Sequence, residues 1–87
     1  MSNNLILRRV EMTEEYRPLS DRPLVGTVTL TAAPTNAGPV FLRGDGGEDV
    51  PLTSGEYHLL KRISLSDVWL KGWPGDYVTV IGGTWRD

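Results

Sequence analysis

The chain of 87 residues contains no cysteine and a single histidine, His58. Without thiols it can form neither a disulfide nor a thiolate zinc site. A single histidine excludes a metal site with two histidine ligands and leaves any Ser-His-Asp triad dependent on His58. A domain of this size buries only about 60–70% of the surface that its unfolded chain exposes. We therefore expect a thin stability margin that is supplemented by self-association or by docking on a larger body.

The sequence also lacks a long apolar run and a marked excess of either charge. No segment approaches the roughly eighteen apolar residues of a membrane span, and no basic group precedes an apolar stretch at the N-terminus. We therefore expect a protein made in a cytoplasm, with no membrane partner. Nine basic and eleven acidic residues give a net charge of −2, which argues against binding to a nucleic acid backbone.

Composition changes early in the chain. Residues 1–23 have mixed charge and isolated apolar residues, and we interpret them as an N-terminal arm that reaches another molecule, with 24–87 as the folded domain. Within the arm, Leu5–Met12 could form a strand with one apolar face, whereas a helix over Met12–Arg17, ended by Pro18, is the alternative. The candidate partner-binding residues of the arm are its arginines Arg8, Arg9 and Arg17.

The rest of the chain has the pattern of a β protein. Threonines alternate with apolar residues over Thr27–Ala32, which predicts a half-buried strand. Val68–Lys71 and Tyr77–Ile81 are rich in β-branched and aromatic residues, and Trp73–Asp76 between them places proline and glycine as a type II turn requires. These segments predict a hairpin. Turn signals about every 8–12 residues predict an all-β domain, either a small antiparallel sandwich or a jelly-roll-like fold.

No group of residues predicts catalysis or a bound cofactor. His58 lies in an expected strand, where a structural role is favoured over that of a catalytic base. The acidic, glycine-rich segment Gly44–Asp49 lacks the spacing of a calcium loop and the lysine of a phosphate cradle, so we interpret it as a solvated hairpin tip. Ser54 and Ser66 occupy positions where turn hydroxyls are expected. We expect no enzyme, no metal, no cofactor and no small-molecule substrate.

Three tryptophans, Trp69, Trp73 and Trp85, lie within the last nineteen residues. Tryptophan is enriched at the energetic centres of protein interfaces. We assign Trp69, in an expected strand, to the core. Trp73 beside a turn and Trp85 near the C-terminus are harder to bury, and they are the candidate anchors for a partner. Indole rings also stack on sugars and on single-stranded nucleic acid. The scattered basic residues argue against nucleic acid and leave a carbohydrate as the alternative.

The order of the turn motifs resembles that of the small β-rich virion proteins of tailed bacteriophages. An Asn36–Gly38 turn leads into a strand and a Pro51–Glu56 turn leads into the next. A strand that begins at Leu65–Val68, followed by a Gly75–Asp76 turn, closes the sheet. The resemblance covers residues 24–83. Within this group of virion proteins, the chain is similar to head decoration proteins, which are also called cement proteins.

The resemblance implies binding rather than catalysis. It implies a structural accessory protein of the virion, in first place a capsid decoration protein that clamps neighbouring shell subunits. Such a protein is expected to form a homo-oligomer, with a trimer favoured, on the major capsid protein or other virion proteins. A neck, tail or head-fibre component is the alternative within the virion, and a carbohydrate- or host-surface-binding module is the alternative from another class. The chain departs from the pattern at Trp73 and Pro74, where small residues are commoner.

Overall fold

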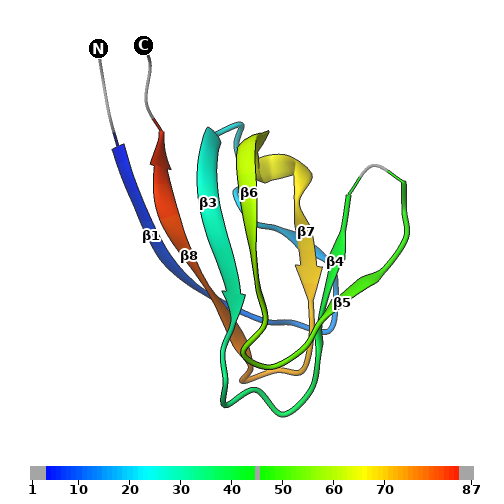
Figure 1. The fold of residues 1–87 in the computed structure, drawn as a ribbon. Helices are drawn as coiled ribbons and strands as arrows, with labels where there is room; N and C mark the ends of the chain where they lie inside the picture. Colours follow the sequence, from blue (N-terminus) through cyan, green and yellow to red (C-terminus); the bar gives the residue numbers. More distant parts are fainter. Residues whose placement is uncertain (1–3, 45, 85–87) are drawn as a thin grey trace.

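The computed structural model describes residues 4–44 and 46–84, which form two four-stranded antiparallel sheets packed as a sandwich (Figure 1). This confirms the predicted all-β fold. The first sheet contains, in spatial order, β1 (Asn4–Glu11), β8 (Tyr77–Thr84), β3 (Val25–Ala32) and β6 (Tyr57–Ser64). The second contains β2 (Arg17–Pro18), β7 (Trp69–Lys71), β4 (Val40–Arg43) and β5 (Val50–Leu52). A short 3-10 helix, η1 (Leu65–Asp67), joins β6 to β7.

Strict alternation of burial explains the central strands of the first sheet. In β3, Val28, Leu30 and Ala32 are buried while the threonines between them face outward, so the strand predicted over Thr27–Ala32 is confirmed. The same alternation recurs over residues 77–81 of β8. Side chains from both sheets meet between the layers and form one core, as the two-layer architecture requires. The largest fully buried side chains are those of Val28, Leu30, Val40, Leu52, Leu65, Val78 and Val80.

Residues 4–23 belong to the packed body and do not project from it as the expected arm. β1 pairs with β8 along its whole length. Ile6, Met12 and Leu19 are buried in the core. The strand alternative therefore describes this segment, and Met12–Arg17 contains no helix. The mixed charge that suggested an arm has another physical reason, because an edge strand with one solvent-exposed face also alternates apolar and charged residues.

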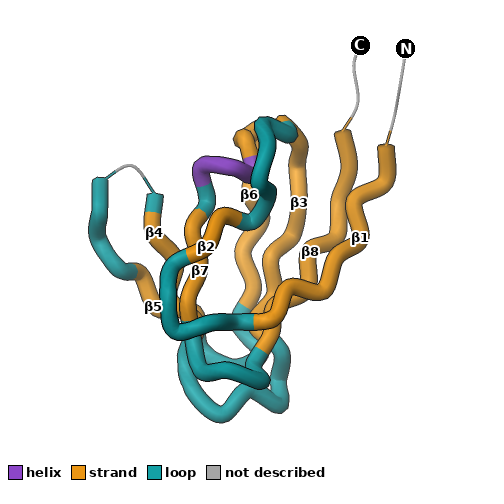
Figure 2. Tube along the Cα trace, turned by 180° about the vertical axis from the view of Figure 1, so that it is seen from behind, coloured by secondary structure: helices purple, strands orange, loops and turns teal. Residues whose placement is uncertain are grey.

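The turn at Trp73–Asp76 forms, but the hairpin predicted around it does not. The Asp76 N–H donates to the Trp73 carbonyl at 3.0 Å, and Gly75 has a φ of +99°. The turn connects β7 in the second sheet to β8 in the first, so the chain changes layers here (Figures 1 and 2). Strand length explains the choice of partners. β8 has eight residues and pairs with β1 and β3, which are equally long, whereas the three-residue β7 pairs with other short strands.

The acidic segment 44–49 connects β4 to β5, which pair as an antiparallel hairpin, so its position at a hairpin tip is confirmed. Asp45 lies outside the described residues. Within the described ranges, no three His, Asp or Glu side chains group in a way that could hold a metal ion. The same ranges contain no helix of the length and apolarity needed to span a membrane.

Candidate functional site

Two turns that are distant in the sequence are tied together at one end of the sandwich. The Asn36 side chain accepts a hydrogen bond from the Tyr77 N–H and donates one to the Tyr77 carbonyl, each at 2.9 Å. The carboxylate of Asp76 accepts from the backbone N–H groups of Ala37 at 2.9 Å and Gly38 at 3.1 Å. Asp76 is only 6% exposed. We call these four hydrogen bonds the two-turn clamp.

The two-turn clamp fixes the position of Trp73. Gly38 lies directly against the indole ring, because a β-carbon added at Gly38 would fall 2.6 Å from Cδ1 and 2.7 Å from Nε1 of Trp73. Glycine is the one residue that permits so close an approach. Trp73 is nevertheless 62% exposed. Its ring is therefore held by backbone on one side and open on the other.

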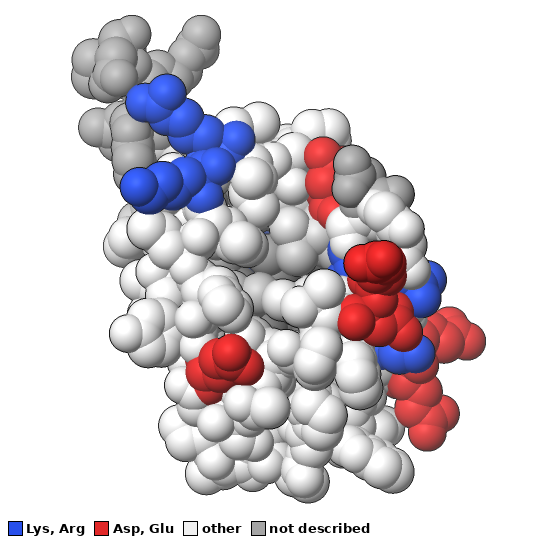
Figure 3. All heavy atoms as spheres, turned by 45° about the vertical axis from the view of Figure 1, so that its right-hand side comes forward, with Lys and Arg blue, Asp and Glu red and all other residues white. Residues whose placement is uncertain are grey.

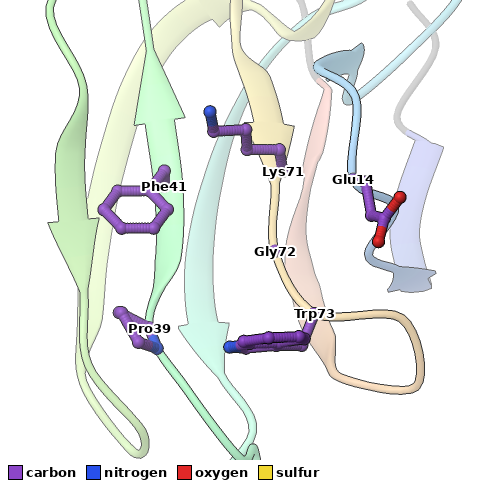
Figure 4. Close-up of a pocket in the computed structure, with 6 residues that line it drawn as sticks. All are labelled: Glu14, Pro39, Phe41, Lys71, Gly72 and Trp73. Carbon is purple, nitrogen blue, oxygen red and sulfur yellow. The ribbon is translucent and has the colours of Figure 1, made fainter.

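Trp73 forms one wall of a shallow apolar depression beside the second sheet (Figure 4). Pro39 and Phe41 lie across the depression from Glu14, and the indole of Trp73 extends between the two sides toward Pro39. Lys71 stands beside Phe41 because the two residues are paired in the β4–β7 register. We call this depression, of about 390 Å³, the Trp73 cleft. Its lining residues are Glu14, Pro39, Phe41, Lys71, Gly72 and Trp73.

A cluster of aromatic and charged side chains adjoins the Trp73 cleft. The Tyr16 ring faces two cations, with Cζ of Arg43 at 4.1 Å and Nζ of Lys71 at 4.9 Å from its centroid. Asp49 accepts hydrogen bonds from the Tyr16 hydroxyl and, at 2.8 Å, from Arg43. Nζ of Lys71 also lies 5.9 Å from the centroid of Phe41, and so it joins the cluster to the cleft. Such contacts order a charged rim beside an apolar depression.

Hydrogen bonds within the cluster shift the pKa values of two of its members, Asp49 and Tyr16. Hydrogen bonds from Tyr16 and Arg43 hold the pKa of Asp49 below its usual value. Burial and the hydrogen bond to Asp49 raise the pKa of the Tyr16 hydroxyl above its usual value. Both shifts move the pKa away from neutrality, whereas a general acid or base needs a pKa close to the working pH.

The predicted partner-binding arginines do not gather at the Trp73 cleft. Arg8 and Arg9 lie on β1 in the first sheet, and both make contacts within the chain. The Arg8 guanidinium donates to the Leu19 carbonyl at 3.4 Å, and the Arg9 guanidinium lies 3.9 Å from the centroid of the Tyr77 ring. Arg17, in β2, lines a second shallow depression. The arginines are therefore spread over both sheets.

The predictions for the three tryptophans compare differently with the structure. Trp73 lies in the cleft, as described above, and Trp85 falls outside the described residues. The assignment of Trp69 to the core is wrong, because Trp69 is 39% exposed on the outer face of β7, opposite Arg43. Only one of two successive strand residues can face the core, and in β7 the buried position is taken by Leu70.

His58, Ser54 and Ser66 each have a local partner. His58 is exposed on β6, and its Nε2 lies 3.6 Å from a carboxylate oxygen of Glu56. The Ser54 hydroxyl donates to the Asn36 carbonyl at 2.9 Å. The Ser66 hydroxyl lies 2.8 Å from that of Ser64. Both serines therefore act as turn hydroxyls, as the sequence predicted.

Charge is unevenly distributed over the surface. Figure 3 shows a face on which charged side chains are sparse over the middle, with basic side chains at the upper left, a mixed group of acidic and basic side chains on the right, and one isolated acidic side chain at the lower left. Depletion of charge at the centre and enrichment at the margins is typical of protein interfaces. Comparisons with protein-family models, curated proteins and solved structures give no match to this chain. Function is therefore inferred from the residues and the surface alone.

Proposed function

We propose that the chain is a structural accessory protein of a bacteriophage virion, in first place a capsid decoration protein that binds the assembled head. The resemblance of its turn motifs to those of small β-rich virion proteins supports this proposal. The observation that carries it is the Trp73 cleft. There a large indole is exposed, walled by Pro39 and Phe41, and already held in place by the two-turn clamp.

The Trp73 cleft suits docking on protein because little order remains to be imposed. Burial of an interface tryptophan contributes most when the ring enters a well-packed, water-free contact. A loop of a shell protein inserted between Trp73 and Phe41 would cover the indole and leave Lys71 and Glu14 at the margin, where charges select a partner. Docking across a joint between shell subunits would add buried area that resists outward pressure. The proposed partner is the major capsid protein or another virion protein.

Trp73→Ala tests this role, with Trp69→Ala as the matched control. Trp69 is also an exposed tryptophan of the second sheet, but it lies outside the cleft lining. We expect Trp73→Ala to weaken co-sedimentation with particles that lack the protein by about thirtyfold or more, because loss of a central interface tryptophan costs about 2–4 kcal/mol. Both variants should melt close to the wild-type temperature. Equal particle binding by Trp73→Ala and the wild type would rule out the cleft as the docking site.

A carbohydrate- or host-surface-binding module is the second candidate. An open indole face beside the polar groups of Lys71 and Glu14 is the arrangement that stacks on a sugar ring and bonds its hydroxyls. A glycan-binding assay on the same variants separates the two functions. Loss of glycan binding by Trp73→Ala, with particle binding unchanged, would favour this second function. Co-sedimentation with separated heads and with separated tails would distinguish a decoration protein from a neck, tail or head-fibre component.

A further inference from the structure

The described part of the chain has four sheet edges, and three of them are protected against pairing with another strand. β5 has three residues and contains Pro51, and β2 has two residues and contains Pro18. β6 is long, but its register with β3 shifts at Lys61–Arg62, where Arg62 has a φ of +52°. Short strands, prolines, bulges and charges are the devices that prevent edge pairing. β1 is the remaining edge.

β1 has eight residues, no proline and a continuous register with β8 (Figure 1). Among the described residues, one edge of this strand pairs with no other strand. The Met12 N–H donates to the Asp76 carbonyl at 2.9 Å, one step beyond the last pair of the ladder, so even-numbered residues of β1 bond toward β8. Hydrogen-bonded pairs alternate in an antiparallel ladder. The odd-numbered residues therefore direct their N–H and C=O groups away from the sheet; they are Leu5, Leu7, Arg9 and Glu11.

Three charged residues lie in β1, namely Arg8, Arg9 and Glu11, and charged side chains commonly protect an edge. Glu11 is the last residue of the strand, and both arginines make contacts within the chain. The Arg8 guanidinium is bonded to the Leu19 carbonyl, and the Arg9 guanidinium stacks over Tyr77 on the neighbouring strand β8. The apolar half of β1 is left open, with Leu5 73% and Leu7 61% exposed.

We propose that β1 is a self-association edge, at which a second copy of this chain pairs antiparallel with β1 around a two-fold axis at Leu7. In this register Leu7 faces Leu7 of the other copy and Leu5 faces Arg9, so three of the four outward-directed residues of β1 find backbone partners. An axis at Arg8 or Arg9 would place identical cations opposite each other, which is unfavourable. An axis at Val10 would leave Leu5 and Leu7 uncovered, and an axis at Ile6 would pair fewer of the described residues.

The second copy fits this edge for a further reason. Leu7, Ile81, Thr29 and Leu59 form one row across the outer face of the first sheet, in register from β1 to β6. A two-fold axis at Leu7 continues this row across eight strands. Because β6 is protected, the assembly cannot extend further through the opposite edge and closes as a dimer. The geometry thus points to a dimer, where the resemblance favoured a trimer.

The test uses purified protein without particles, so its outcome is independent of the proposed function. We expect sedimentation equilibrium to give twice the chain mass of 9.6 kDa as concentration rises. Leu7→Lys should weaken the dimer by about tenfold or more, because it removes an apolar pair and opposes two cations on the axis. Leu59→Lys is the matched control, since Leu59 is 55% exposed on the same face but lies on β6. It should leave the dimer intact.

A cysteine variant tests the register and does not depend on the lysine variants. The wild-type chain has no cysteine, so Leu7→Cys introduces one thiol per copy. Opposed hydrogen-bonded residues have Cα atoms about 5.5 Å apart, within the range that a disulfide spans. We expect rapid disulfide formation by Leu7→Cys and little by Leu59→Cys. A protein that stays monomeric at all concentrations, a dimer that Leu59→Lys breaks and Leu7→Lys does not, or slow crosslinking at Leu7 would each overturn the proposal.

Discussion

Substitution of Asp76 is the most direct test of the two-turn clamp. It is nearly buried and accepts two backbone hydrogen bonds, from Ala37 and Gly38. Hydrogen bonds to a charged group contribute about 1.5–3 kcal/mol each. Water can reach part of the site after truncation, so we expect Asp76→Ala to lower the free energy of unfolding by about 2–4 kcal/mol. For a domain of this size that corresponds to roughly 10–25 °C in melting temperature.

Thermal unfolding followed by circular dichroism measures this loss. Asp21→Ala is the control, because it removes an exposed carboxylate and should change the free energy of unfolding by less than about 0.5 kcal/mol. Asp76→Asn keeps one acceptor oxygen and should give an intermediate loss. If Asp76→Ala were as stable as Asp21→Ala, the clamp would not stabilise the fold. The clamp would then not pre-order Trp73 either.

Three further predictions concern other parts of the chain. Deletion of residues 1–23 should abolish cooperative unfolding in calorimetry, because it removes β1 and three core side chains; a truncated protein that still melts cooperatively would restore the arm interpretation. The hydrogen bonds from Tyr16 and Arg43 depress the pKa of Asp49 in the folded protein. Their stabilisation is therefore present above the usual carboxyl pKa and is lost as the pH falls through the lowered pKa. Asp49→Asn should flatten the acid limb of a plot of melting temperature against pH. Calorimetric titration of calcium into the protein should show no micromolar binding at segment 44–49.

The sequence predicted the strands well because burial alternation is a local signal. The period of two over Thr27–Ala32 needs only one buried face, and the structure has one there. The sequence was less successful in predicting which strands pair with each other. The turn at Trp73–Asp76 has the residues of a hairpin turn, yet the chain crosses between sheets, because the lengths of strands elsewhere decide which edges match.

The candidate site was predicted only at Trp73. Its other walls come from distant segments of the chain, and Pro39 and Phe41 reach the cleft only because β4 lies beside β7. The two-turn clamp did have a sequence signal. Asn36 and Asp76 belong to the turn motifs on which the resemblance to virion proteins depends. In the structure these two turn residues make tertiary hydrogen bonds, and the clamp that they form positions the side chain of Trp73.

The two proposed surfaces lie on different sheets and can be occupied together. β1 is an outer edge of the first sheet, whereas the Trp73 cleft adjoins β4 and β7 of the second. A dimer paired through β1 would therefore present two clefts related by its two-fold axis. Once one cleft had bound a shell subunit, the second would bind within the same assembly and at a high effective concentration, provided that the subunits are suitably spaced. Leu7→Lys should then weaken particle binding even though Leu7 contacts no shell protein, while the affinity of a single cleft stays unchanged. Equal avidity of Leu7→Lys and the wild type for particles, despite loss of the dimer, would show that each copy docks alone.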